Sequence, residues 1–233
     1  MRRKHFGRCV AALALLGAAP VLVGTARGQT HTPTLESVLE QLDNSARNFR
    51  SLSANVESTK VTVVVNDHST ENGTLLVRGD KMLMQLAPPD QRTILRMGDN
   101  IYIYTPGLKQ VEEYNLGKNR DLADEFLLLG FGTSGKELQK GFEIKLVGEE
   151  KLGDKKDLQL ELTPKAPGVR NQIAKVEIWL DETTWLAEQQ QITEASGDYS
   201  TVKYTKVVRN PRISDNEFKQ LWPKGTEHVK PQG

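Results

Sequence analysis

The sequence predicts a mainly β (α+β) protein: an open, incomplete antiparallel β-barrel of about eleven strands, with three short helices forming a lid on the concave side. Short segments with β periodicity are separated at regular intervals by turns rich in Gly, Pro, Asn and Asp. In the later segments one parity is apolar and the other polar, as in Leu158, Leu160 and Leu162, which indicates a sheet covered on one face. Helical signals are confined to three short segments.

Residues 1–28 are predicted to be a cleaved secretory signal. A basic start, Met1-Arg2-Arg3-Lys4, precedes an apolar run over residues 9–23 and a small-residue exit that ends at Gly28. The run is shorter than the roughly 20 apolar residues that span a bilayer, although a retained anchor is the alternative. We therefore expect cleavage near Gly28, export, and one domain over residues 29–233.

The composition of residues 29–233 excludes several classes of protein. The only cysteine is Cys9, so after cleavage no disulfide or cysteine metal site is expected. Loss of the five basic residues of 1–28 changes the formal net charge from +1 to −4, which disfavours nucleic-acid binding. The histidines form no ligand pair and no paired catalytic set is present, so we expect no metal, no cofactor and no enzyme activity.

The expected helices are residues 33–49, with Thr32 as N-cap and Pro33 in the first turn, residues 121–131, and a segment after the capping box of Ser134 and Glu137. A long strand from Leu52 is expected to carry a bulge near Thr59, and Asn72-Gly73 to form a hairpin turn. The other expected strands are 73–77, 81–86, 93–97, 101–104, 108–115, 142–147, 158–162, 176–180, 186–193 and 199–208.

A glycine-rich stretch, Gly130-Phe-Gly-Thr-Ser-Gly-Lys136, nearly matches a phosphate-binding loop. Glu137 stands where that loop needs a hydroxyl, and the flanking meander offers no βαβ unit. The stretch is therefore interpreted as a flexible glycine joint between two lid helices.

Two strands are apolar at both parities, residues 81–86 and 101–104. In a sheet that is otherwise wet on one face, this pattern indicates that something further is covered. Methionine suits a surface that fits varied apolar partners, so we expect a lipid-like ligand. The candidate cavity and lid residues are Met82, Met84, Leu86, Leu95, Met97, Ile101, Ile103, Tyr104, Phe126, Leu128, Leu129 and Phe131.

Four segments resemble the family of the outer-membrane lipoprotein carrier LolA and its lipoprotein-sorting relatives. They are GTLLVR (73–78), MGDNIYIYTPGLKQ (97–110), LELTPK (160–165) and FKQLWPKG (218–225). Their order and spacing carry the resemblance.

The resemblance implies an eleven-stranded half-barrel closed by three helices, in a monomer of the periplasm that binds the acyl chains of lipoproteins. The implied partners are an inner-membrane lipoprotein-releasing ABC transporter and an outer-membrane lipoprotein acceptor. Arg78 matches the family arginine that helps keep the unloaded lid shut. A lipid-sensing periplasmic regulator, or a carrier of another lipid or glycolipid, is the alternative. The chain ends soon after Trp222, without the further C-terminal domain expected of a regulator.

Overall fold

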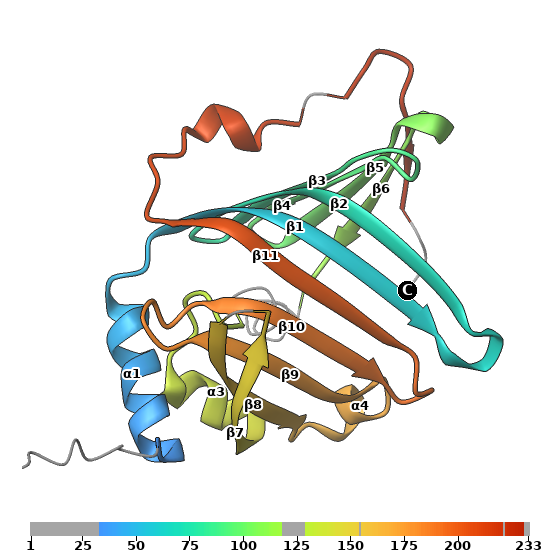
Figure 1. Ribbon diagram of the computed structural model, residues 1–233. Helices are drawn as coiled ribbons and strands as arrows, with labels where there is room; N and C mark the ends of the chain where they lie inside the picture. Colours follow the sequence, from blue (N-terminus) through green and yellow to red (C-terminus); the bar gives the residue numbers. More distant parts are fainter. Residues whose placement is uncertain (1–32, 118–128, 154, 221, 231–233) are drawn as a thin grey trace, which may run out of the picture. The chain divides into compact units, whose positions relative to one another are not determined.

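The protein is described by a computed structural model that covers residues 33–117, 129–153, 155–220 and 222–230 (Figure 1). Within these residues the chain forms one twelve-stranded sheet. The strands are β1 (Ser51–Thr62), β2 (Asp67–Arg78), β3 (Lys81–Leu86), β4 (Arg92–Met97), β5 (Asn100–Thr105), β6 (Gln110–Asn115), β7 (Phe142–Leu152), β8 (Lys155–Pro164), β9 (Ile173–Asp181), β10 (Ala187–Glu194), β11 (Tyr199–Arg209) and β12 (Glu227–Val229).

The sheet consists of two meanders joined edge to edge. Its strand order is β12-β6-β5-β4-β3-β2-β1-β11-β10-β9-β8-β7, so β1–β6 and β7–β11 each run through consecutive neighbours and meet at the β1–β11 pair. Every pair is antiparallel except β12 with β6. The order has two ends, β12 and β7, and the predicted open antiparallel sheet is thereby confirmed. The short β12 was not predicted.

Helices α1 and α3 begin at residues whose side chains cap them. Helix α1 (Leu35–Arg47) starts at Thr34, whose hydroxyl accepts a hydrogen bond from the Ser37 backbone N–H in a capping box. The prediction of Thr32 as N-cap was therefore wrong by two residues. Helix α3 (Gly135–Gly141) starts at the predicted capping box of Ser134 and Glu137. The short α4 (Pro167–Arg170) joins β8 to β9 and was not predicted.

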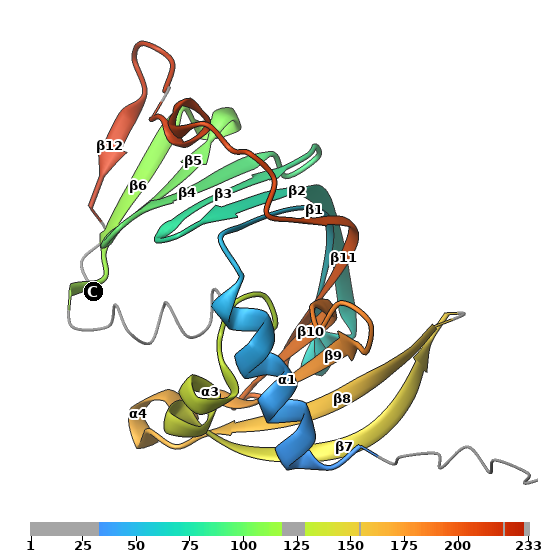
Figure 2. The same ribbon diagram turned by 90° about the vertical axis from the view of Figure 1, so that its left-hand side faces the viewer.

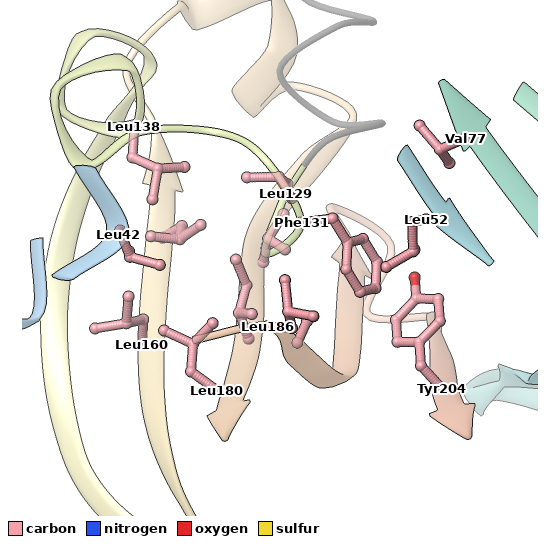
Figure 3. Packing of buried hydrophobic residues seen from close by; sticks show 14 of the residues in the cluster. Leu42, Leu52, Val77, Leu129, Phe131, Leu138, Leu160, Leu180, Leu186 and Tyr204 are labelled. Carbon is pink, nitrogen blue, oxygen red and sulfur yellow. The ribbon is translucent and has the colours of Figure 1, made fainter. Parts of the chain in front are cut away.

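Helices α1 and α3 cover the interior face of the second meander, as Figure 2 shows. Their buried residues, among them Leu42 of α1 and Leu138 of α3, face leucines of β8 and β9 (Figure 3). The side chains of that part of the sheet are at most 1% exposed: Leu158, Leu160, Leu162, Val176, Ile178 and Leu180. The alternation read from the sequence is thus the signature of a face buried under helices.

Glycines in the chain between the two meanders allow close packing. A Cβ on Gly130 would lie 2.5 Å from Cβ of Ala187, and one on Gly135 would lie 2.5 Å from the backbone oxygen of Leu39. Gly130 also has a φ of +77°, which favours glycine. The glycine-rich stretch therefore lets the chain approach β10 and α1 closely.

Two further expectations about the first meander were wrong. β1 pairs with β2 without a shift from Ser51 opposite Arg78 to Thr62 opposite Asp67, and the hairpin turn is the 3-10 segment Val63–Val65. Asn72-Gly73 therefore lies inside β2. The irregularity in β1 lies between Ser53 and Asn55, against β11, and not near Thr59.

None of the helices in the described residues is long and apolar enough to cross a membrane.

Candidate functional site

The candidate site is the interior face of β3, β4 and β5. Directly opposite residues of antiparallel strands point to the same face. Met84 is opposite Ile94, and Ile94 is opposite Ile103, so these three side chains lie on one face. Met82 lies on the same face and is opposite Val77, which belongs to the core, so this face is the one that the core covers. We call this set the interior strip: Met82, Met84, Leu86, Ile94, Ile101 and Ile103.

The residues of the interior strip are covered unevenly. Met82 and Leu86 of β3 are 8% and 5% exposed, whereas Met84, Ile94, Ile101 and Ile103 are only half-buried. The sheet residues under α1 and α3, by contrast, are fully buried. The strip is therefore apolar surface that the described residues only partly cover, as a surface for an apolar ligand requires.

Polar groups interrupt the interior strip on β4 and border it on β6. Arg96 is opposite both Met82 and Ile101, is 1% exposed, and donates from Nε to the carbonyl oxygen of Gly98 at 2.9 Å. On β6 the hydroxyl of Tyr114 donates to Glu112 at 2.6 Å, and this bond raises the pKa of Tyr114. The sequence analysis did not identify Arg96. The signal was present, because Arg96 and Ile94 are two residues apart on one strand and so share the covered face.

Leu129 and Phe131, the ends of the segment Leu129–Phe131, belong to the same buried core cluster as Met82 and Leu86 of the interior strip. Leu129 and Phe131 are buried, at 1% and 2% exposure. The rings of Phe131 and Tyr204 pack edge to face, with their centroids 4.6 Å apart (Figure 3). We call the segment Leu129–Phe131 the closing segment. Phe126 and Leu128, which were predicted to belong to the lid, lie outside the described residues.

Backbone and side-chain hydrogen bonds anchor the closing segment to β10. The backbone N–H of Ala187 donates to the Gly130 carbonyl at 2.8 Å, and the Gln190 side-chain amide donates to the Leu129 carbonyl. Gln190 in turn accepts from the Tyr204 hydroxyl at 3.0 Å. Burial raises the pKa of Tyr204, so its hydroxyl stays a donor. These are buried, mutually satisfied contacts, which fix one position of the segment.

The other candidate residues lie on the outer face of the sheet. Leu95 is opposite Tyr102, and Thr93 is opposite Tyr104, so Leu95, Met97 and Tyr104 point away from the interior strip. Leu95 is 1% exposed. The cover over this face comes from the C-terminal segment, which we define as residues 213–220 and 222–229.

Aromatic side chains attach the C-terminal segment to the outer face. Phe218 is 1% exposed in the 3-10 turn Asp215–Phe218, which contacts β3 and β4. Trp222 packs on Tyr104 with ring centroids 5.2 Å apart. The additional cover that the sequence indicated for these strands is thus, on the outer face, supplied by the chain itself.

Arg78 belongs to this outer contact. Its guanidinium donates to the Ile213 carbonyl and to Asp215, and lies 5.6 Å from the centroid of the Phe218 ring. Lys81 also binds Asp215, at 2.5 Å. The structure therefore ties Arg78 to the C-terminal segment, whereas the resemblance implied a role at the lid.

Phe218→Ala is expected to lower the free energy of unfolding by about 3–5 kcal/mol, the usual cost of removing a buried aromatic ring. The affinity for an apolar ligand should not change, because Phe218 lies on the outer face. Chemical denaturation and probe titration measure the two quantities. A large loss of affinity in the folded variant would contradict the assignment of the two faces.

Acid is expected to weaken the same attachment. The hydrogen bond from Lys81, followed by the charge of Arg78, lowers the pKa of Asp215. The ion pairs therefore contribute above the ordinary range of aspartate, near pH 4, and are lost as the pH falls through the lowered pKa. Trp222 fluorescence should report this acid transition, and Asp215→Asn should show the weakened attachment already at neutral pH.

The chain thus folds as an open antiparallel sheet with a helix-covered core, a partly covered apolar strip and an anchored closing segment, which is the architecture of a protein that can hold an apolar ligand. The family model of the outer membrane lipoprotein carrier protein LolA matches residues 47–220. The chain therefore belongs to the LolA family.

Similar proteins support the assignment. An outer-membrane lipoprotein carrier protein of Cupriavidus pinatubonensis is 26% identical over 234 residues, which cover 99% of this chain and 100% of the relative. Another outer-membrane lipoprotein carrier protein, of Dechloromonas aromatica, is 24% identical over 193 residues, which cover 82% of this chain and 86% of the relative. An uncharacterized conserved protein of Thermus thermophilus matches the fold with a TM-score of 0.54 at 10% identity, covering 84% of this chain and 98% of that structure.

Proposed function

We propose that this protein is a periplasmic carrier that binds the acyl chains of lipoproteins and moves them from the inner to the outer membrane. Family membership and the names of the relatives support a lipoprotein carrier. The structural observation that carries the proposal is the interior strip, in which Ile94, Ile101 and Ile103 are apolar and only half-buried. Residues 1–28 are proposed as the signal that exports the protein.

The energetics of an acyl chain explain why such a carrier is needed. Each CH₂ removed from water contributes about 0.8 kcal/mol, so a long acyl chain in the periplasm costs on the order of 10 kcal/mol. A lipoprotein with such chains cannot cross the aqueous space unaided. The interior strip offers apolar area to these chains without covalent chemistry, so the proposed role is not enzymatic.

The closing segment gives the carrier a way to hold and release its cargo. Leu129 and Phe131 fill part of the core cluster to which Met82 and Leu86 of the strip also belong. Acyl chains that take their place must break the contacts to Ala187, Gln190 and Tyr204. Cargo is therefore held less tightly than open apolar surface would hold it, which allows transfer to a more apolar acceptor. The donor and acceptor are proposed to be a lipoprotein-releasing ABC transporter and an outer-membrane lipoprotein acceptor.

Release of lipoprotein from spheroplasts tests the proposed function. The purified protein, added to spheroplasts, is expected to bring acylated lipoproteins into the medium in a soluble complex. The matched control is a lipoprotein whose acylated cysteine is replaced, which should not be bound. Failure to solubilise acylated lipoprotein, or equal binding of the unacylated control, would contradict the proposal.

A further inference from the structure

Three carboxylates meet where β8, β9 and β10 come together. Asp157 of β8 is directly opposite Asp181 of β9, an arrangement of like charges that destabilises an antiparallel pair. Glu188 of β10 lies at the register shift between Ala187 and Gln189, and such bulges redirect side chains near functional sites. One carboxylate oxygen from each of the three residues lies within 4.8 Å of the other two.

Asp157 is the deeply buried member of the cluster. Its exposure is 0%, and neither carboxylate oxygen has a hydrogen-bond partner within the described residues. A buried carboxylate without a partner is costly to keep in a fold. This side chain therefore indicates a missing positive partner.

Lys155 supplies only part of the positive charge that the cluster needs. Its ammonium group contacts Glu188 and lies 3.6 Å from Oδ2 of Asp181, while 59% of its side chain is exposed. Oδ1 of Asp181 accepts from the backbone N–H groups of Thr183 and Thr184, both at 2.8 Å, which leaves Oδ2 for the cluster. The ammonium group of one largely exposed side chain thus faces three carboxylates.

We propose that Asp157, Asp181 and Glu188 bind a Ca²⁺ ion that displaces the ammonium group of Lys155. Carboxylate oxygens are the preferred ligands of this hard cation. Three carboxylate oxygens within 4.8 Å of one another can share one Ca²⁺ ion, whose ligands lie at about 2.3–2.6 Å. Mg²⁺ fits less well because it keeps most of its water ligands and is usually held by one or two carboxylates. A neighbouring cavity of about 530 Å³, lined in part by Lys155, Asp181 and Glu188, gives the ion and its water ligands access. The site is independent of the proposed lipoprotein binding.

Calorimetric titration of the chelator-stripped full chain with CaCl₂ tests the site. The wild type is expected to bind one Ca²⁺, more tightly than Mg²⁺, and to gain thermal stability. Asp157→Asn should weaken binding by about tenfold or more. Lys155→Met should strengthen it, because the competing ammonium group is gone. Glu149→Gln, at an exposed pair with Lys156 on the same β7–β8 hairpin, is the control and should bind as the wild type does.

Two results would overturn the site. One is the absence of Ca²⁺ binding by the wild type up to about 10 mM, well above the range of extracellular calcium modules. The other is unchanged affinity in folded Asp157→Asn. If that variant does not fold, Lys155→Met decides, since a cation site there predicts tighter binding and an unrelated site predicts no change.

Discussion

Ile103→Asp is expected to lower the affinity for a fluorescent long-chain acyl probe by about tenfold or more. Ile103 is half-buried on the interior strip, opposite Ile94. A carboxylate at this position must be desolvated when an acyl chain covers it, and a cost of about 1.4 kcal/mol already gives a tenfold change in affinity. Equilibrium titration of the purified variant with the probe measures the effect.

Leu108→Asp is the matched control for this experiment. Leu108 lies in the turn between β5 and β6, in the same hairpin as Ile103, and is 69% exposed. The substitution adds the same charge without placing it on the strip, so binding should remain as in the wild type. If Ile103→Asp binds as tightly as Leu108→Asp, the strip is not the ligand surface.

Phe131→Ala is expected to lower the free energy of unfolding by about 3–5 kcal/mol and at the same time to raise the apparent affinity for the acyl probe. The loss of stability follows from removing a ring that is 2% exposed. The gain in affinity follows because the closing segment competes with the ligand. A weaker closed state raises the fraction of protein that is competent to bind. Denaturant unfolding and probe titration measure the two effects.

Phe142→Ala separates lid competition from general loosening. Phe142 is also 2% exposed, at the start of β7 next to α3, so its loss should cost a similar amount of stability. It does not belong to the closing segment, and the affinity should not rise. A rise of equal size in both variants would contradict the role given to Phe131.

The sequence predicted those elements whose environment is uniform along the strand. In β8 and β9 the apolar residues of one parity lie on the face that the helices cover, and the structure confirms their position and period. On the opposite face of β9, Glu177 and Trp179 are nevertheless buried, at 9% and 6% exposure. The capping box of Ser134 is likewise a local signal for a local contact. Where sequence and fold agree at this level, pattern alone was sufficient.

Candidate site residues could be found from sequence but not sorted by face. Both parities of β5 are apolar, which correctly indicated additional cover. The sequence of one strand does not reveal that Tyr104 packs against Trp222, which is far away in the sequence, while Ile103 faces the interior. Likewise the closeness of Asp157, Asp181 and Glu188 depends on strand pairing and a bulge, so no local motif announced it.

Local turn signals failed where tertiary contacts decide the conformation. Asn-Gly is a strong hairpin signal, yet Gly73 lies inside β2, where a Cβ would collide with the backbone of Gln85 on β3. The glycine is required by the close approach of the neighbouring strand. The glycine-rich stretch at Gly130 follows the same principle, since its spacing serves packing against β10 and α1.

Site-specific photo-crosslinking in the periplasm tests the central claim most directly. A photoreactive amino acid at position 103, on the interior strip, is expected to capture acylated lipoproteins, and the adduct should be lost when the acylated cysteine of the cargo is replaced. The same amino acid at position 108 should capture none. Crosslinking to acylated lipoprotein at position 108 but not at position 103, or to unacylated cargo at position 103, would contradict the account.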